Sequence, residues 1–361
     1  MSLVDQVNQR RREIRTDGYL MSVGEWISLY EGDEIDIHPE FQRIFRWSNV
    51  QKTNLIESIL LGIPIPPVFV SQRRDGIWDV VDGLQRLSTI YELIGILKDD
   101  TGIVIPPLTL TKTKYLPELE GKCWDDLEQE LRLIIKRSKI GASIILKESD
   151  DEAKYDLFQR LNTGGSQLSP QEVRNCIMVM LNNDFYDWLK SLAEYESFQE
   201  CVALSERPLN QAYDIELALR FVIFSLIDEA ELSNIGDVGV FITDKMSELC
   251  VSDSFDRGLW ERLFKRTFDL LNDHLNSESF KRYNAAKNKF MGGFLLSQFE
   301  VVAYGVAYNL NADINIQNLR EKVAAIWADS EYTAWSGSGI TATRRLPRII
   351  PYGRRVFCNG N

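Results

Sequence analysis

The sequence predicts an α+β protein in which a mixed α/β part is followed by an all-helical part. Apolar runs bounded by Gly and Pro, which are typical of buried strands, occur only as far as Leu146. From Ser169 to about residue 330 the pattern is almost wholly helical, and strand-like alternation of any length does not return. We therefore place a boundary near 165 and predict a first domain over residues 1–165 and a second over residues 166–361.

Local patterns assign the elements of the first part in chain order. Ser48 and Gln51 have the spacing of a capping box, so a helix starts there, and Gly62 ends it. The prolines that follow form a stiff connection to a strand. The expected elements are helices over residues 3–15 and 23–30, a strand over 35–38, a helix over 49–61, strands over 68–70 and 77–81, a helix over 84–97, a strand over 103–110, mainly helical structure over 123–138, a strand over 140–146 and a helix over 150–161.

Helices of the second part are predicted to be buried. Ser169 and Pro170 start the first of them by the usual rules, with Ser at the N-cap and Pro at the first position. The segment Tyr213–Ile227 is apolar nearly all round, as in a helix buried on every side. The most hydrophobic window, Phe290–Tyr308, is interrupted by polar residues and glycines, so we expect a core helix there and no membrane span.

Composition limits the classes of function. The net charge of −12 gives no support to non-specific nucleic-acid binding, although a local basic patch is compatible with it. The five cysteines are scattered without a Cys-x-x-Cys pair, which indicates reduced, mostly buried thiols in a cytoplasmic protein. With only His38 and His274, a His-rich zinc site and a His-based nuclease motif are nearly excluded. The N-terminus lacks the apolar stretch of a secretory signal.

The stretch Asp82-Gly83-Leu84-Gln85-Arg86 has the clearest functional signal in the chain, because it joins the end of an apolar strand to the start of a helix. One interpretation is purely structural: Asp82 is the N-cap and Gln85 the third helical residue, an arrangement worth about 1 kcal/mol. The other is an anion site, in which free N–H groups of the first turn and the planar fork of Arg86 hold phosphate, with Thr89 nearby. Asp82 would then bind a hydrated metal or orient water. Local chemistry leaves both open.

Two further stretches are ambiguous in the same way. Phe41-Gln42-Arg43 can stack on a base and contact phosphate, or it can pack as a lid over the core. The loop Asn162-Thr163-Gly164-Gly165-Ser166 can wrap its backbone around a phosphate, or it can simply join two helices. The sequence has neither a Walker A motif nor a complete G-x-G-x-x-G, so P-loop and Rossmann sites are not available.

Arginines are concentrated at the end of the chain. Residues 340–361 contain five arginines and no acid, so this segment is locally basic, with Arg344, Arg345 and Arg348 as candidates for nucleic-acid contact. The same arginines can instead pair with some of the 53 acidic residues elsewhere.

Three motifs in this order resemble a known family. They are Phe41-Gln42-Arg43 with Trp47 and the helix end Ser58–Pro64, then Val81–Ile90 around Asp-Gly-Leu-Gln-Arg, then Phe158–Gly165 followed by Leu168–Glu172. Together they resemble the N-terminal domain of GmrSD-type modification-dependent restriction systems, over roughly residues 20–230.

This resemblance implies a ParB/sulfiredoxin-like α/β domain with a helical extension. It also implies a nucleotide-binding and hydrolysing site made of Asp82, Gly83, Gln85 and Arg86. Around that site the resemblance places Gln42 and Arg43 and the loop with Asn162, Gly164 and Gly165. Two departures matter: Leu84 stands where the family commonly has Gln, and the His-Asn-His nuclease half of the full enzymes has no counterpart here.

The function expected is therefore an NTP-binding, NTP-hydrolysing domain of a prokaryotic restriction or phage-defence system. Arg86 and Arg43 would hold phosphates, Asp82 would position Mg²⁺ or the attacking water, and Gln85 would orient nucleotide or water. A nuclease subunit in trans would cleave DNA. The alternative is a non-catalytic module that binds DNA or a modified base. A third possibility is a structural subunit in which the motifs only fold the protein.

Overall fold

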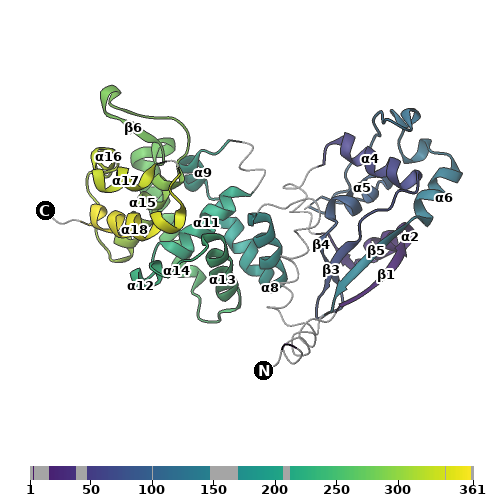
Figure 1. Ribbon diagram of the computed structural model, residues 1–361, viewed down its shortest axis with the longest axis horizontal. Helices are drawn as coiled ribbons and strands as arrows, with labels where there is room; N and C mark the ends of the chain where they lie inside the picture. The colour runs from purple at the N-terminus through teal and green to yellow at the C-terminus, as the bar shows by residue number, and fades with distance from the viewer. Residues whose placement is uncertain are drawn as a thin grey trace. The chain divides into compact units, whose positions relative to one another are not determined.

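The computed structural model describes Leu3 and residues 16–37, 47–99, 101–146, 170–205, 212–337 and 339–358. It divides into two compact units, Met1–Leu168 and Ser169–Asn361. Each unit has elements of a different kind, a mixed sheet with helices in the first and a helical assembly in the second (Figure 1).

A five-stranded mixed sheet organises the first unit, in the order β1-β5-β3-β4-β2. The outer pair β1 and β5 and the central pair β3 and β4 are antiparallel, whereas β5 is parallel to β3 and β2 is parallel to β4. The strands are β1 (Thr16–Ser22), β2 (Ile35–Asp36), β3 (Val68–Gln72), β4 (Trp78–Asp82) and β5 (Lys139–Ile145).

Four helices share one hydrophobic core with this sheet. Alternate residues such as Val68, Val70, Ile140 and Ala142 point into the core from β3 and β5, as strand geometry requires. Helix residues such as Trp26 complete it. The helices are α2 (Val23–Glu31), α4 (Asn49–Leu60), α5 (Leu84–Ile94) and α6 (Gln129–Arg137), with short 3₁₀ turns η1 (Pro117–Leu119) and η2 (Trp124–Asp126) before α6.

Several sequence predictions are confirmed in this unit. The Ser48–Gln51 capping box begins α4, with both reciprocal hydrogen bonds present. The strands over 68–70, 77–81 and 140–146 exist with ends shifted by one or two residues. The predicted helix over residues 3–15 and the continuation of the 35–38 strand past residue 37 lie outside the described residues, apart from Leu3.

One sequence prediction is wrong there. Residues 103–110 form only an isolated bridge, from Val104 to Lys98, because Pro106 and Pro107 have no N–H for a strand ladder. The segment 123–138 is mainly helical, as predicted, and consists of the 3₁₀ turn η2 followed by α6. Strand β1 was not predicted, because its residues Thr16–Leu20 are all exposed and so lack an apolar alternation.

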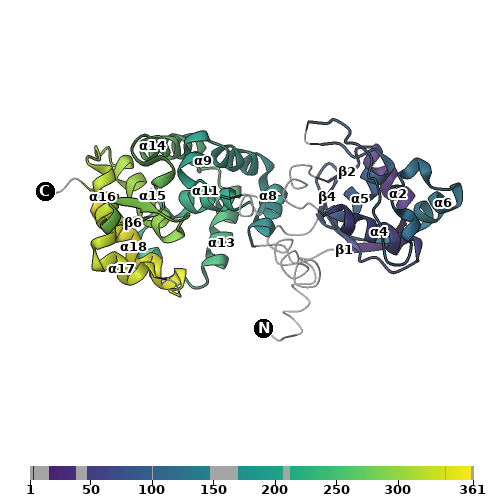
Figure 2. The ribbon, with the colours of Figure 1, turned by 90° about the horizontal axis from the view of Figure 1, so that it is seen from above.

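The second unit is helical, as predicted, apart from one small hairpin. Its helices are α8 (Pro170–Ala193), α9 (Glu196–Val202), α11 (Tyr213–Phe224), α12 (Glu229–Leu232), α13 (Val238–Val251), α14 (Arg257–Leu275), α15 (Leu296–Asn311), α16 (Leu319–Ala325), α17 (Ser330–Ser336) and α18 (Ala342–Phe357). The 3₁₀ turns η3 (Asn276–Glu278) and η5 (Ile326–Ala328) follow α14 and α16, and η4 (Ala285–Lys287) lies in the loop of the hairpin. Figure 2 shows the helices of this unit from a second direction. The hairpin is β6 (Arg282–Asn284) with β7 (Lys289–Met291), which corrects the expectation that no strand returns after residue 169.

The buried helices of this unit coincide with most of each predicted apolar window, although α15 begins only at Leu296 because the start of the Phe290–Tyr308 window belongs to β7 and the loop after it. Helices α11 and α15 are buried along most of their length. Helix α15 crosses α18 closely, because a Cβ on Gly305 would lie 2.6 Å from the carbonyl oxygen of Gly353. Among the described residues, no helix combines the length and the apolar character that crossing a bilayer requires.

Candidate functional site

The turn between β4 and α5 carries the motif that the sequence singled out. Strand β4 ends at Asp82, Gly83 follows with φ 102°, and α5 begins at Leu84. Gly83 is the N-cap, and no side chain caps this helix. The capping box expected between Asp82 and Gln85 is therefore wrong, because the chain needs one more residue to turn from strand to helix. Among the described residues, no side chain accepts a hydrogen bond from the N–H groups of this first turn.

Gly83 is required at this turn for two independent reasons. Its φ of 102° is one that residues with a side chain rarely adopt. A Cβ there would also meet the side chain of Val68 at 2.8 Å and its Cα at 3.2 Å. The close approach of β3 and the turn thus leaves the helix N-terminus without any covering side chain at position 83.

Arg86 lies across this turn and is held from two sides. Its Nη2 donates to the Asp82 carboxylate at 2.9 Å and to the carbonyl oxygen of Pro67 at 3.1 Å. The side chain of Arg86 is 13% exposed and that of Asp82 is 36% exposed, so the pair sits at the edge of the core. The Nε–H of Arg86 is buried and has no hydrogen-bond partner in the described part of the chain, which leaves one donor of a charged group unused there.

Gln85 connects this turn with the motif around residue 43. Its Oε1 accepts a hydrogen bond of 3.0 Å from the backbone N–H of Trp47. Trp47 directly follows the Phe41–Arg46 stretch and directly precedes Ser48, the N-cap of α4. The structure therefore places Trp47, the last residue of the Phe41–Trp47 motif, against Gln85 of the Asp82–Arg86 motif. Sequence analysis missed this bond, since it depends on a backbone atom.

Thr89 and Ser88 lie one turn further along α5. Thr89 is fully buried, and its hydroxyl donates to the carbonyl oxygen of Gln85 at 2.6 Å. The hydroxyl of the neighbouring Ser88 is also buried and has no partner. The hydroxyl of Thr89 is thus engaged within α5 itself.

Other expected members of the site cannot be placed. Gln42 and Arg43 lie outside the described residues, as do Asn162, Gly164 and Gly165. The structure therefore brings together Asp82, Gly83, Gln85 and Arg86 only.

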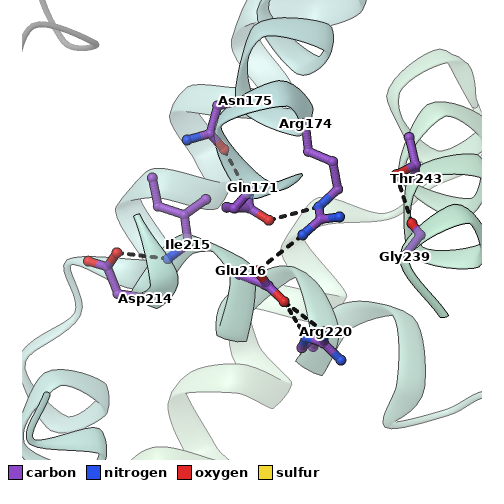
Figure 3. Close-up of polar contacts among 9 residues, drawn as sticks. All are labelled: Gln171, Arg174, Asn175, Asp214, Ile215, Glu216, Arg220, Gly239 and Thr243. Atoms are coloured by element: carbon purple, nitrogen blue, oxygen red, sulfur yellow. Dashed lines mark hydrogen bonds and ion pairs between the residues drawn. The ribbon is translucent and has the colours of Figure 1, made fainter. Parts of the chain in front are cut away.

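The last motif continues into a buried polar cluster at the start of α8 (Figure 3). Gln171 donates from Nε2 to Asn175 at 2.8 Å and accepts from Nε of Arg174 at 2.8 Å. Arg174 and Arg220 both contact the carboxylate of Glu216, at 3.1 and 2.7 Å. Because these residues are buried or nearly so, the cluster fastens α8 to α11. The available sequence signal was the i,i+4 pair of charges inside the otherwise apolar Tyr213–Ile227 segment.

The terminal arginines are divided between structural and exposed positions on α18. Arg345 donates from Nε to the buried carboxylate of Glu300 at 2.6 Å, and Nη2 adds a second bond at 3.0 Å. Arg344 and Arg348 are exposed, and Arg348 lies over the ring of Trp335 at 5.6 Å. The basic surface of this segment is therefore smaller than the count of arginines suggested.

Within the described ranges, no group of three or more His, Cys, Asp or Glu side chains could hold a metal ion. Asp82 is the one motif carboxylate at the β4–α5 turn, and it is paired with Arg86. Such a site fits Mg²⁺ only in the manner of phosphate-bound Mg²⁺, which takes one or two carboxylates and the substrate's own oxygens.

Taken together, the turn has the properties of an anion site. Uncapped N–H groups carry the partial positive charge of the helix end, and an arginine with a free donor lies beside them. A phosphate group matches both features, because it accepts several hydrogen bonds and carries negative charge.

The chain was compared with known proteins at the level of family, sequence and structure. Residues 25–179 match the family described as the GmrSD restriction endonuclease N-terminal domain. The match runs from α2 into α8 and includes the β4–α5 turn and the Gln171–Asn175 segment. No curated protein and no solved structure matches the chain.

Proposed function

Because residues 25–179 are a domain of the GmrSD restriction endonuclease N-terminal family, we propose that this protein is a nucleotide-binding component of a restriction or phage-defence system. The nucleotide is an NTP, and its phosphates bind at the turn between β4 and α5. The observation that carries the proposal is the uncapped start of α5 beside the unpartnered Nε–H of Arg86.

Each motif residue has a defined part in this proposal. The N–H groups after Gly83 and the guanidinium of Arg86 contact phosphate oxygens, while Gln85 holds the segment that enters α4. Asp82 is the protein ligand of the Mg²⁺ that accompanies the phosphates, or it orients water, once Arg86 turns from it to the nucleotide. Bound Mg²⁺ would neutralise charge on the phosphates.

Residues outside the described ranges complete the proposed site. Gln42 and Arg43 lie five and four residues before Trp47, which Gln85 holds, so they are proposed to reach the same phosphates. The loop with Asn162, Gly164 and Gly165 is proposed to close over the nucleotide. The mixed sheet with one helical side is proposed to be a variant of the ParB/sulfiredoxin-like fold.

DNA cleavage is assigned to a partner. The sequence contains only two histidines, His38 and His274, and they do not form a His-Asn-His motif. We therefore propose that a nuclease in trans cleaves DNA and that NTP binding or hydrolysis by this chain controls it.

The test is a titration of the purified protein with each of ATP, GTP, CTP and UTP in the presence of Mg²⁺, together with a phosphate-release assay. Arg86→Ala should weaken binding by about tenfold or more, because a hydrogen bond to a charged group contributes about 1.5–3 kcal/mol. Asp82→Asn keeps the shape of the side chain, so it should slow phosphate release more than it weakens binding.

Arg74→Ala is the matched control. Arg74 is exposed in the turn before β4, so its removal takes one positive charge from the same unit without touching the α5 N-terminus. If the wild-type protein binds none of the four nucleotides, or if Arg86→Ala and Arg74→Ala behave alike, the proposed site is wrong.

A second candidate function is a DNA-binding module without turnover. It is favoured by the exposed Arg344 and Arg348, which are one helical turn apart on α18. Salt-dependent duplex binding that is lost in Arg344→Gln with Arg348→Gln, in a protein that binds no NTP, would establish it.

A further inference from the structure

The β6–β7 hairpin of the second unit is a basic segment of an acidic protein. Residues 279–299 contain Lys281, Arg282, Lys287 and Lys289 and no acid, although the whole chain has a net charge of −12. None of the four forms an ion pair with a described acid: Lys281 reaches the hydroxyl of Ser277, and Arg282 lies over a tryptophan ring. These charges therefore remain available to an anionic ligand.

A pocket of about 840 Å³ lies between this hairpin and the end of α16 with η5. Its walls include Arg282, Tyr283, Asn284 and Met291 from the hairpin side, and Trp327 with small alanines from the other side. The two segments lie side by side in both views of the molecule (Figures 1 and 2). The size is within the range of pockets that hold a ligand of about the size of a nucleotide.

The residues that line this pocket are suited to bind a planar aromatic ring. Trp327 and Tyr283 supply aromatic faces, and the guanidinium plane of Arg282 lies 5.5 Å from the centre of the Trp327 ring. The indole N–H of Trp327 is buried and has no hydrogen-bond partner among the described residues. Nucleobases have both a π-face and ring-edge acceptors, and they stack on aromatic and arginine side chains.

The arrangement of charge favours a polymer over a single nucleotide. Lys287 and Lys289 are exposed and do not line the pocket, although they belong to the same hairpin. A ligand that uses them has to extend from the pocket along the hairpin with repeated negative charge. A polynucleotide backbone does this, and its unpaired bases are free to enter a pocket.

We propose that the β6–β7 hairpin and the Trp327 pocket form a binding site for single-stranded nucleic acid, with one base in the pocket and the backbone along the lysines. This site consists of other residues than the phosphate site at α5, so each proposal is tested independently of the other. Base pairing would keep a base from entering the pocket, so the site discriminates against intact duplex.

The test is fluorescence anisotropy of a labelled dT 20-mer, titrated with the full chain at a series of salt concentrations. The wild-type protein should bind, and the logarithm of the affinity should fall linearly with the logarithm of the salt concentration. Lys287→Gln with Lys289→Gln should reduce the steepness of that line by about 1.4, at about 0.7 for each single-strand phosphate contact.

Arg262→Gln with Arg266→Gln is the control, since it removes two exposed positive charges from α14 outside the hairpin. It should leave the slope close to that of the wild type. Trp327→Ala should weaken binding at least about fivefold through loss of stacking. Trp327→Phe, which keeps a ring but lacks the N–H, should lose less than Trp327→Ala, provided that both variants melt like the wild type.

Three results would overturn the proposal. They are no binding of the dT 20-mer at low salt, equal salt slopes for the hairpin and α14 variants, and equally tight binding of a 20-base-pair duplex. Arg86→Ala should keep the affinity for the oligonucleotide, and the hairpin variants should keep the affinity for NTP. Failure at one site is therefore distinguishable from failure at the other.

Discussion

At the scale of single residues, the candidate phosphate site depends on the absence of a side chain at Gly83. A side chain at this position would collide with Val68 and would also disfavour the backbone angle that turns the chain from β4 into α5. The same absence leaves the helix N-terminus open. Asp82 pairs with Arg86 beside it and does not cap α5, although its place in the sequence suggested a cap.

Gly83→Ala should lower the free energy of unfolding by more than Gly76→Ala does. Both glycines have positive φ, 102° and 95°, and a Cβ in such a conformation costs about 1–2 kcal/mol. Only at position 83 would the Cβ meet other atoms, because nothing lies within 4 Å of it at position 76. Urea unfolding of both variants measures the difference. Equal losses would show that the close approach of Val68 is unimportant.

Asp214 should make stability depend on pH. Burial raises the pKa of Asp214 above its ordinary value of 3.8, so the folded chain holds this proton after the unfolded chain has lost it. Between the two pKa values the folded state binds more protons, and stability therefore falls as pH rises. Asp214→Asn has no such titration, so its stability relative to the wild type should increase as pH rises above about 3.8 and then level off.

Urea midpoints at a series of pH values, with Asp273→Asn on the exposed side of α14 as a control substitution, measure this effect. A stability difference between Asp214→Asn and wild type that is the same at every pH would contradict it.

At the scale of elements, the sequence predicted best where a local pattern determines the structure. The capping box at Ser48 and the apolar windows of α11 and α15 depend on neighbours within a few residues. Helices α4 and α11 begin where they were predicted, and α15 forms over most of its window. Strand β1 was missed because its exposed residues carry no alternation, and its partner β5 is more than 100 residues away. A pairing of that kind is set by tertiary contacts, which local patterns do not encode.

For the motif residues too, features set by the local sequence were predicted and contacts set by tertiary folding were not. The strand, the glycine and the helix around residue 83 were predicted, and so was the arginine in the first turn. The pairing of Asp82 with Arg86, the bond from Trp47 to Gln85 and the carbonyl of Pro67 depend on chain folding. These contacts decide which donors remain free, and spacing alone does not give them.

Glu216→Gln should strongly destabilise the second unit. The carboxylate of Glu216 contacts both Arg174 and Arg220 where both are buried, so its removal takes a negative partner from each of these charges. Loss of one partner of a buried pair typically costs about 3–5 kcal/mol. The matched control is Glu261→Gln, which breaks the exposed i,i+4 pair with Lys265 and should cost less than about 0.5 kcal/mol.

Chemical denaturation of both variants gives the comparison. Similar small losses for Glu216→Gln and Glu261→Gln would mean that the cluster at the start of α8 does not hold that helix to α11.

At the scale of the whole molecule, the two units carry different candidate sites. The first unit has the open helix end and the arginine that suit a phosphate, within the part that matches the restriction family. The second unit has the basic hairpin and the aromatic pocket that suit a single strand. A chain that binds NTP through one unit and nucleic acid through the other has the two inputs that a nucleotide-controlled defence component needs.

The central claim is that the start of α5 binds the phosphates of an NTP, and amide hydrogen exchange tests it most directly. With saturating Mg²⁺ and the NTP that binds best, exchange should slow in peptides that cover residues 82–90. Peptides from the β6–β7 hairpin should not change, and Arg86→Ala should abolish the protection at the same nucleotide concentration. Bound nucleotide without protection at residues 82–90, or with protection confined to other segments, would contradict the claim.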